Sequence, residues 1–240
     1  MSARRVFVPR ERIADGRARL EPADLHHLRD VLRLGPGAPV EVFDGEGGVH
    51  DGRLEGDALV LGPRRDVPPP AARVHLAFAL ARGERSDLAV QKATELGVSR
   101  LLPFEAARSV VRLEAARAVD RQRRWQRIAA EAARQCGRGD VPEVALPGSL
   151  AAALAAIPPG FRLLVFHEGG GEPLRALVDR AAPGHAAVVG PEGGLAPEEV
   201  EACLAAGGRL ATLGPRILRF ETAAIAAVAL VQHLAGDLGS

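Results

Sequence analysis

Hydrophobic positions in the first part of the chain come in short stretches that glycine-containing turns separate. Residues 5–8, 40–43 and 58–61 have the length and apolar content of β-strands. Turn signals such as Asp44-Gly45 and Asp51-Gly52 lie between these stretches. The pattern predicts a compact β-barrel or sandwich.

One helix is expected within this β-rich part, at residues 22–34. It begins at a proline suited to a first helical turn and stops before Gly35. One face of the helix carries Leu25, Leu28 and Leu32. We expect this face to pack on the strands.

A proline-rich stretch then separates two kinds of pattern. Residues 66–73 read Asp-Val-Pro-Pro-Pro-Ala-Ala-Arg, and three consecutive prolines fit neither a central strand nor a helix interior. We expect an extended, stiff connector here. The predicted domains are therefore residues 1–68 and residues 73–240.

Apolar strands alternate with helices in the second domain. Strands are expected at residues 74–80, 98–103, 162–166, 186–189 and 209–213. Helices are expected at residues 85–96, 113–136, 150–156, 172–181, 197–206 and 221–235. Strands separated by helices indicate an α/β fold with a parallel sheet.

Composition limits the class of protein. An apolar share of 47% in 240 residues supports a full hydrophobic core. The longest apolar run, residues 222–234, is shorter than the ~20 residues of a membrane span, so we expect no membrane insertion. The arginine-rich residues 1–12 lack the apolar centre of a signal peptide. Cys136 and Cys203 have no metal-ligand spacing around them, which indicates a reduced, cytoplasmic protein without a metal site.

The net charge is +1, but the charged residues are distributed unevenly along the chain. Residues 1–33 hold eight arginines against five acidic residues, and residues 117–138 hold seven against two. From residue 139 onward the balance reverses, with six arginines against eleven acidic residues. Two basic segments suit a protein that meets a polyanion on one side, although charged runs more often only face solvent.

Lys92 is the sole lysine of the chain. A GC-rich genome explains this scarcity, because lysine codons are AT-rich, and heat adaptation is the alternative explanation.

Three glycine-containing loops follow predicted strands, at residues 166–171, 189–194 and 213–222. Ligands of parallel α/β sheets bind at the carboxyl ends of strands, where glycine lets the backbone approach them. Each loop alone is more often a tight turn. The spacings GxxxxGK[ST] and GxGxxG are absent, which excludes a P-loop and disfavours a dinucleotide fold, and no GxSxG hydrolase elbow occurs.

The third loop places two arginines and a glutamate beside an apolar helix. Arginines in such surroundings need anionic or hydrogen-bonding partners. A structural ion pair of Arg219 with Glu221 or Glu192 is one explanation, and a role in a ligand site is the other.

The chain reads Gly-Pro-Glu-Gly-Gly at 190–194, then has an expected helix, and reads Leu-Gly-Pro-Arg-Ile-Leu-Arg-Phe-Glu-Thr-Ala at 213–223. Apart from Phe220, where the family's residue varies, these segments resemble the C-terminal signature of the RsmE family, which methylates N3 of a uridine in small-subunit (16S) ribosomal RNA. Similar segments are distributed along almost the whole chain, at residues 5–9, 27–34, 42–45, 82–97 and 131–138.

This resemblance implies a PUA-like β-barrel followed by an α/β domain of the SPOUT superfamily, whose last segment forms a trefoil knot. It implies that S-adenosylmethionine binds in the knot and that the protein is a homodimer. The apolar helix at residues 222–234 is then either interface or plain domain core. The cofactor-binding residues carried over are Phe166, His167, Gly190, Pro191, Glu192, Gly193, Gly194, Leu213, Gly214, Ile217, Leu218 and Arg219.

Methylation at N3 of uracil requires a deprotonated or polarised ring nitrogen. On the resemblance, Arg219 is expected to face the charge that develops on the uracil, and Glu221 is a candidate base. Arg5 and Arg138 are expected to position uracil or phosphate. RNA contact is assigned to Arg4, Arg5, Arg10 and Arg12 and, on the long helix, to Arg121, Arg123, Arg124 and Arg127.

The expected partner is ribosomal RNA or the small ribosomal subunit. Two alternatives stay open. One is another SPOUT enzyme that acts on transfer RNA or on a ribose hydroxyl, and the other is a non-catalytic RNA-binding assembly protein that keeps the fold.

Overall fold

The computed structural model describes residues 4–109, 112 and 114–239. They form two compact units. The first comprises the chain up to Pro69 together with Ala130–Val141, and the second comprises Pro70–Ala129 and the chain from Pro142 onward. The proline-rich segment lies where the chain passes from the first unit to the second, and the return of residues 130–141 to the first unit has no counterpart in a division into 1–68 and 73–240.

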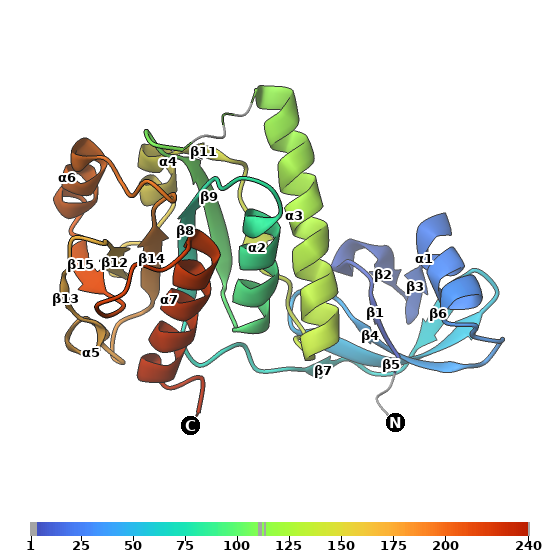
Figure 1. The fold of residues 1–240 in the computed structure, drawn as a ribbon. Coiled ribbons are helices and arrows are strands. Elements are labelled where there is room, and N and C mark those ends of the chain that lie inside the picture. The colour runs from blue at the N-terminus through green and yellow to red at the C-terminus, as the bar shows by residue number, and fades with distance from the viewer. Residues whose placement is uncertain (1–3, 110–111, 113, 240) are drawn as a thin grey trace. The chain divides into compact units, whose positions relative to one another are not determined.

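A seven-stranded sheet with the order β1-β4-β5-β6-β3-β2, and with β7 on β5, forms the first unit (Figure 1). The β1–β4 pair is parallel and the other pairs are antiparallel. The strands are β1 Arg5–Phe7, β2 Ile13–Ala14, β3 Arg17–Arg19, β4 Pro39–Phe43, β5 Gly48–Glu55, β6 Ala58–Leu61 and β7 Arg65–Asp66.

The prediction of a turn at Asp51-Gly52 is wrong, because both residues lie within strand β5. A Cβ at Gly52 would come within 3.2–3.3 Å of side-chain atoms of Leu61, Val42 and Val40. Glycine is needed here because side chains of the neighbouring strands pack over it, and not because the chain reverses.

The expected helix is present as α1, Pro22–His26, which continues as a π-helical turn over His27–Val31. A short 3-10 turn at Arg10–Arg12 precedes it. Leu28 is fully buried, and Leu25 and Leu32 pack against the same hydrophobic cluster. The predicted apolar face is therefore confirmed.

The second unit is built on a parallel sheet with the order β10-β9-β8-β14-β12-β15-β13, and β11 pairs with β9. Its strands are β8 Val74–Ala79, β9 Arg100–Glu105, β10 Glu143–Val144, β11 Gly148–Ser149, β12 Arg162–Phe166, β13 Glu172–Pro173, β14 His185–Val189 and β15 Arg209–Thr212. Its helices are α2 Arg85–Glu95, α3 Ala115–Cys136, whose end belongs to the first unit, α4 Leu150–Ala155, α5 Leu174–Leu177, α6 Pro197–Ala205 and α7 Phe220–Ala235. The predicted α/β class is confirmed.

The helix predicted at 172–181 is wrong in extent. Glu172 and Pro173 pair with β15 as a short edge strand, and only Leu174–Leu177 are helical. Two interactions explain this. The Glu172 carboxylate pairs with Arg209 of β15, and the backbone N–H of Asp179 donates to the buried His185 ring at 3.2 Å. Both partners lie outside the segment, so its own periodicity does not reveal them.

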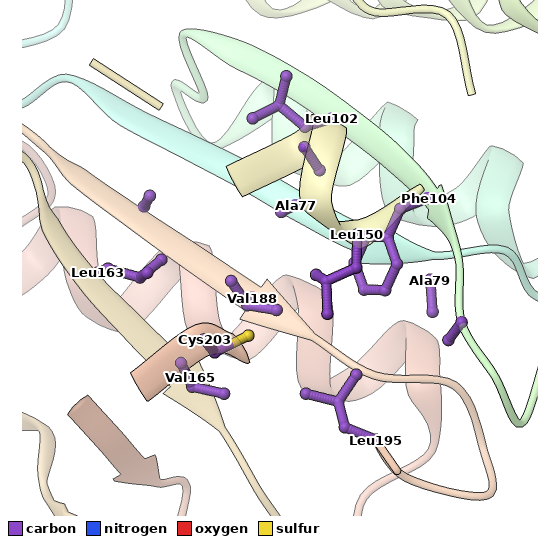
Figure 2. Packing of buried hydrophobic residues seen from close by; sticks show 13 residues of the cluster. Ala77, Ala79, Leu102, Phe104, Leu150, Leu163, Val165, Val188, Leu195 and Cys203 are labelled. Atoms are coloured by element: carbon purple, nitrogen blue, oxygen red, sulfur yellow. The ribbon is translucent and has the colours of Figure 1, made fainter. Parts of the chain in front are cut away.

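Helices cover both faces of this sheet (Figure 1). On one face, Phe78 of β8 meets Trp125 of α3 edge to face, with 5.6 Å between ring centroids, and Phe220 of α7 lies at 6.2 Å. On the opposite face, Figure 2 shows Cys203 of α6 beside Val165 and Val188. This second cluster also includes Leu150, Phe104 and Leu195.

None of the helices among the described residues has the length and apolar character needed to cross a membrane.

Candidate active site

One cavity of about 520 Å³ lies at the carboxyl ends of three neighbouring strands, β14, β12 and β15. The three glycine-containing loops meet there. The lining residues are Phe166, His167, Glu168, Gly169 and Gly170 from the first loop, Val189, Gly190, Pro191, Glu192, Gly194 and Leu195 from the second, and Thr212, Leu213, Gly214, Pro215, Arg216, Ile217, Leu218, Phe220 and Ala223 from the third loop and α7.

Backbone conformation shapes the cavity wall. Gly194 and Gly214 have φ values of +70° and +103°, a region that side-chain-bearing residues rarely adopt. A Cβ on Gly190 would come within 3.1 Å of the Leu195 backbone nitrogen. Leu195 itself is buried in the core cluster, which fastens the end of the second loop to the sheet. The glycines thus bring bare backbone to part of the cavity wall.

Most of the predicted cofactor-binding residues line this cavity. The exceptions are Gly193 and Arg219, which are absent from the lining. Gly193 instead accepts a hydrogen bond on its carbonyl oxygen from Arg108, at 3.1 Å. The prediction omitted some lining residues, which lie in the same three loops or in the first turn of α7. Extending the predicted site to every residue of these loops would have found most of them.

The structural ion pair considered for Arg219 is not found among the described residues. Arg219 is exposed, and no partner is found for it among the described residues. Glu192 pairs instead with Arg85, whose Nη1 donates to Glu192 Oε1 at 2.5 Å. Glu221 Oε2 lies 4.0 Å from Arg85 Nε and is buried without a hydrogen-bond partner in the described part of the chain. Sequence analysis did not single out Arg85 as a site residue, although it lies in the 82–97 segment that resembles the family.

Arg5 and Arg138 are occupied within the first unit. Arg5 donates to the Glu41 carboxylate and to the carbonyl oxygens of Ala133 and Arg138, at 3.3 and 3.0 Å, so it closes the end of α3. Arg138 binds the Asp140 carboxylate through two nitrogens, at 3.0 and 2.7 Å. Both side chains are nearly buried, with 12% and 9% exposed. These contacts show that both guanidinium groups also hold the first unit together; that they position uracil or phosphate stays a prediction.

The arginines expected to contact RNA differ in how available they are. Arg12 pairs with Glu21 and Asp24. Arg124 pairs with Asp87, and Arg121 stacks over the Trp125 ring at 5.6 Å. The exposed members for which the described residues offer no partner are Arg4, Arg10, Arg123 and Arg127.

Family comparisons bear directly on this cavity. The RNA methyltransferase domain pattern matches residues 68–232, more than half of the chain and all of the lining residues. The chain belongs to the RNA methyltransferase domain family. The pattern of the RNA methyltransferase PUA domain also matches, at residues 20–59. The β-rich first unit is therefore the PUA-like domain that the resemblance implied.

Relatives of this chain include two proteins named ribosomal RNA small subunit methyltransferase E. The Bacillus subtilis protein is 33% identical over 130 residues, which are 50% of this chain and 50% of that protein. The Mycobacterium tuberculosis protein is 36% identical over 166 residues, which are 65% of this chain and 62% of that protein. The chain thus spans about half to just under two thirds of the length of the curated relatives it matches.

Solved structures match the chain over nearly its whole length. A Legionella pneumophila methyltransferase with bound S-adenosylmethionine has a TM-score of 0.87 at 28% identity, covering 97% of this chain and 98% of that one. The Neisseria gonorrhoeae ribosomal RNA small subunit methyltransferase E, bound to S-adenosylmethionine, has a TM-score of 0.85 at 30% identity, with the same coverage. The resemblance to the RsmE family is confirmed.

Proposed function

We propose that this chain methylates N3 of a uridine in the 16S RNA of the small ribosomal subunit, with S-adenosylmethionine as the methyl donor. The observation that carries the proposal is the convergence of three loops on one cavity, at the strand ends where α/β sheets bind ligands. Similarity to relatives that were solved with this cofactor, over 97% of the chain, supports it.

The cavity fits such a cofactor. Its volume of about 520 Å³ lies within the range of small-molecule pockets, roughly 300–1,000 Å³. Apolar side chains such as Leu213, Ile217 and Leu218 would enclose an adenine ring, and the backbone of the glycine segments would bind its polar edges. The fixed positive-φ glycines keep this surface free of side chains. When bound, S-adenosylmethionine supplies an activated methyl group on a sulfonium centre.

Arg219 is the residue we assign to the uracil. It stands beside Leu218 and Phe220, which line the cavity, while its own side chain is exposed. A guanidinium without a partner in the described residues is free to face the negative charge that develops when N3 loses its proton. Glu221 is proposed as the base that takes this proton. Its carboxylate lies 4.0 Å from the guanidinium group of Arg85.

The chain path in the second unit is proposed to be a trefoil knot, formed where the three loops meet. Supporting this, β12 lies between β14 and β15 in the sheet although it precedes both in sequence. Such threading is very rare in proteins, and the proposal rests on membership of the family.

A homodimer is proposed as the working form. Leu88 of α2 and Leu230 of α7 are 39% and 42% exposed, and these helices pack side by side (Figure 1). The proposal rests on the resemblance to the RsmE family, and these two leucines are the exposed apolar side chains that an interface on α2 and α7 would cover. We place the protein in the cytoplasm, because its proposed substrate is ribosomal RNA.

Mass spectrometry of ribosomal RNA from cells that lack the protein tests the function. The expected result is the loss of one 3-methyluridine from 16S RNA, restored when the gene is supplied again. Loss of a methyl group from transfer RNA or from a ribose would favour another SPOUT activity. An unchanged methylation pattern, together with no binding of S-adenosylmethionine in calorimetry, would favour a non-catalytic assembly protein.

A further inference from the structure

Arg85 lies between two loops of the cavity, although it is not one of the residues that line the cavity. It is the first residue of α2 and follows the end of β8, the neighbour of β14 in the sheet. Its Nη1 donates to Glu192 Oε1 at 2.5 Å, and its Nε lies 4.0 Å from Glu221 Oε2. One guanidinium group therefore faces a carboxylate of the second loop and a carboxylate at the start of α7.

Both carboxylates are tied to the cavity wall. Glu192 lines the cavity, and Glu221 directly follows Phe220, which also lines it. The Glu221 side chain is only 16% exposed, and its Oε2 has no hydrogen-bond partner among the described residues. Removing Arg85 would take away the positive charge that faces both carboxylates, so the second loop and the first turn of α7 would lose the group that links them.

The contribution of Arg85 to overall stability should nevertheless be small. Its side chain is 43% exposed and Glu192 is 35% exposed, and ion pairs at such exposure contribute little to the free energy of unfolding. The consequence of losing Arg85 is therefore local. It concerns the spacing between the second loop and the start of α7.

We propose that Arg85 is a positioning residue of the methyl-transfer site, which sets the Gly190–Gly194 loop against the first turn of α7 through Glu192 and Glu221. This inference rests on the proposed function. Arg85 acts through the two glutamates and the loops that carry them, and it touches neither the cofactor nor the uracil.

The test compares Arg85→Ala with Arg85→Lys, Glu192→Ala and the double variant, and uses Arg82→Ala as the matched control. Arg82 lies three residues earlier, is exposed, and has no partner in the described part of the chain. Calorimetry gives the dissociation constant for S-adenosylmethionine. Steady-state methylation of small-subunit RNA gives kcat and the KM for RNA, and thermal unfolding monitors the fold.

Arg85→Ala is expected to weaken S-adenosylmethionine binding roughly tenfold, the usual scale for a charge-assisted pair, and to lower kcat with an unchanged KM for RNA. Arg85→Lys should recover only part of the cofactor binding and of kcat. It keeps the positive charge, but one ammonium group cannot hold both carboxylates in the same geometry. The effects of Arg85→Ala and Glu192→Ala should be strongly non-additive. Arg82→Ala should resemble the unmodified protein in all three measurements.

Equal effects of Arg82→Ala and Arg85→Ala would overturn the inference, since general loss of positive charge would then explain both. Additive effects of Arg85→Ala and Glu192→Ala would overturn it as well. A raised KM for RNA with normal cofactor binding would make Arg85 an RNA contact instead. If the unmodified protein neither bound S-adenosylmethionine nor methylated RNA, the proposed function itself would fail, which is a distinct result.

Discussion

Asp87 of α2 accepts a hydrogen bond from the indole nitrogen of Trp125 in α3, at 2.8 Å. The other oxygen of the same carboxylate accepts from Arg124 Nε at 3.0 Å. Trp125 is almost fully buried and packs edge to face on Phe78 of the sheet. One carboxylate thus joins two helices over the face of the parallel sheet.

Replacing Asp87 by Ala should lower the free energy of unfolding by about 2 kcal/mol, because the buried indole N–H loses a charged acceptor. Urea denaturation followed by tryptophan fluorescence measures this. Asp87→Asn keeps one acceptor oxygen and should lose about half as much. Equal stability of Asp87→Ala and the unmodified protein would show that water replaces the carboxylate at this position.

Acid should destabilise the fold through His75. Burial in β8, with the charges of Arg100 and Arg73 nearby, lowers the pKa of His75 from 6.5 to about 4. Between these two pKa values His75 is protonated in the unfolded chain and neutral in the folded chain. The free energy of unfolding therefore falls as the pH drops below 6.5 toward 4. Between pH 7 and pH 5 this amounts to about 2 kcal/mol for one such group.

Urea denaturation at pH 7, 6 and 5 checks this expectation. His75→Leu should reduce the pH dependence. Part of it should persist, because burial also lowers the pKa of His185 on the neighbouring strand. An identical pH dependence in His75→Leu and the unmodified protein would assign the acid sensitivity to other groups.

Gly214 and Gly207 offer a matched pair of backbone substitutions. Both have positive φ, +103° and +84°, and a Cβ at either would meet nothing within 4 Å. Ala at each position should cost about 1 kcal/mol of stability through the left-handed backbone alone. Only Gly214 lines the cavity. Calorimetry should therefore find severalfold weaker S-adenosylmethionine binding for Gly214→Ala and normal binding for Gly207→Ala.

Arg219→Ala should lower kcat about a hundredfold, on the scale of losing one group that stabilises a developing anion. Cofactor binding and thermal stability should stay unchanged, because Arg219 is exposed and lies outside the cavity lining. Single-turnover methylation with saturating cofactor measures this. Arg175→Ala, an exposed arginine of α5, is the control. Normal turnover of Arg219→Ala would remove Arg219 from the uracil site.

Salt dependence should separate Arg123 from its neighbour Arg124. Arg123 is exposed and has no acidic partner in the described part of the chain, whereas the charge of Arg124 is compensated by Asp87. If this surface binds RNA, Arg123→Ala should reduce the slope of log affinity against log salt by about 1. Arg124→Ala should change the slope much less. Filter binding over a range of salt concentrations measures both, and equal changes would mean that Arg124 leaves Asp87 in the complex.

Periodicity and turn residues were enough to locate most elements of the second unit. Residues 162–166 and 197–205 were predicted almost to the residue, because a buried parallel strand is continuously apolar and a capped helix has clear ends. Strands of two residues, such as β10 and β13, were missed. They carry no pattern of their own and exist only because a neighbouring strand offers hydrogen-bond partners.

The sequence by itself determined that three glycine-containing loops follow apolar strands, and hence that they share one edge of a parallel sheet, since the carboxyl ends of parallel strands all lie there. Only the tertiary structure decided which charged groups meet. Arg85 and Glu192 are 107 positions apart, and Arg5 and Glu41 are 36 apart. Ion pairs form over a few ångströms in space, and local sequence patterns hold no information on distances between segments that far apart in the chain.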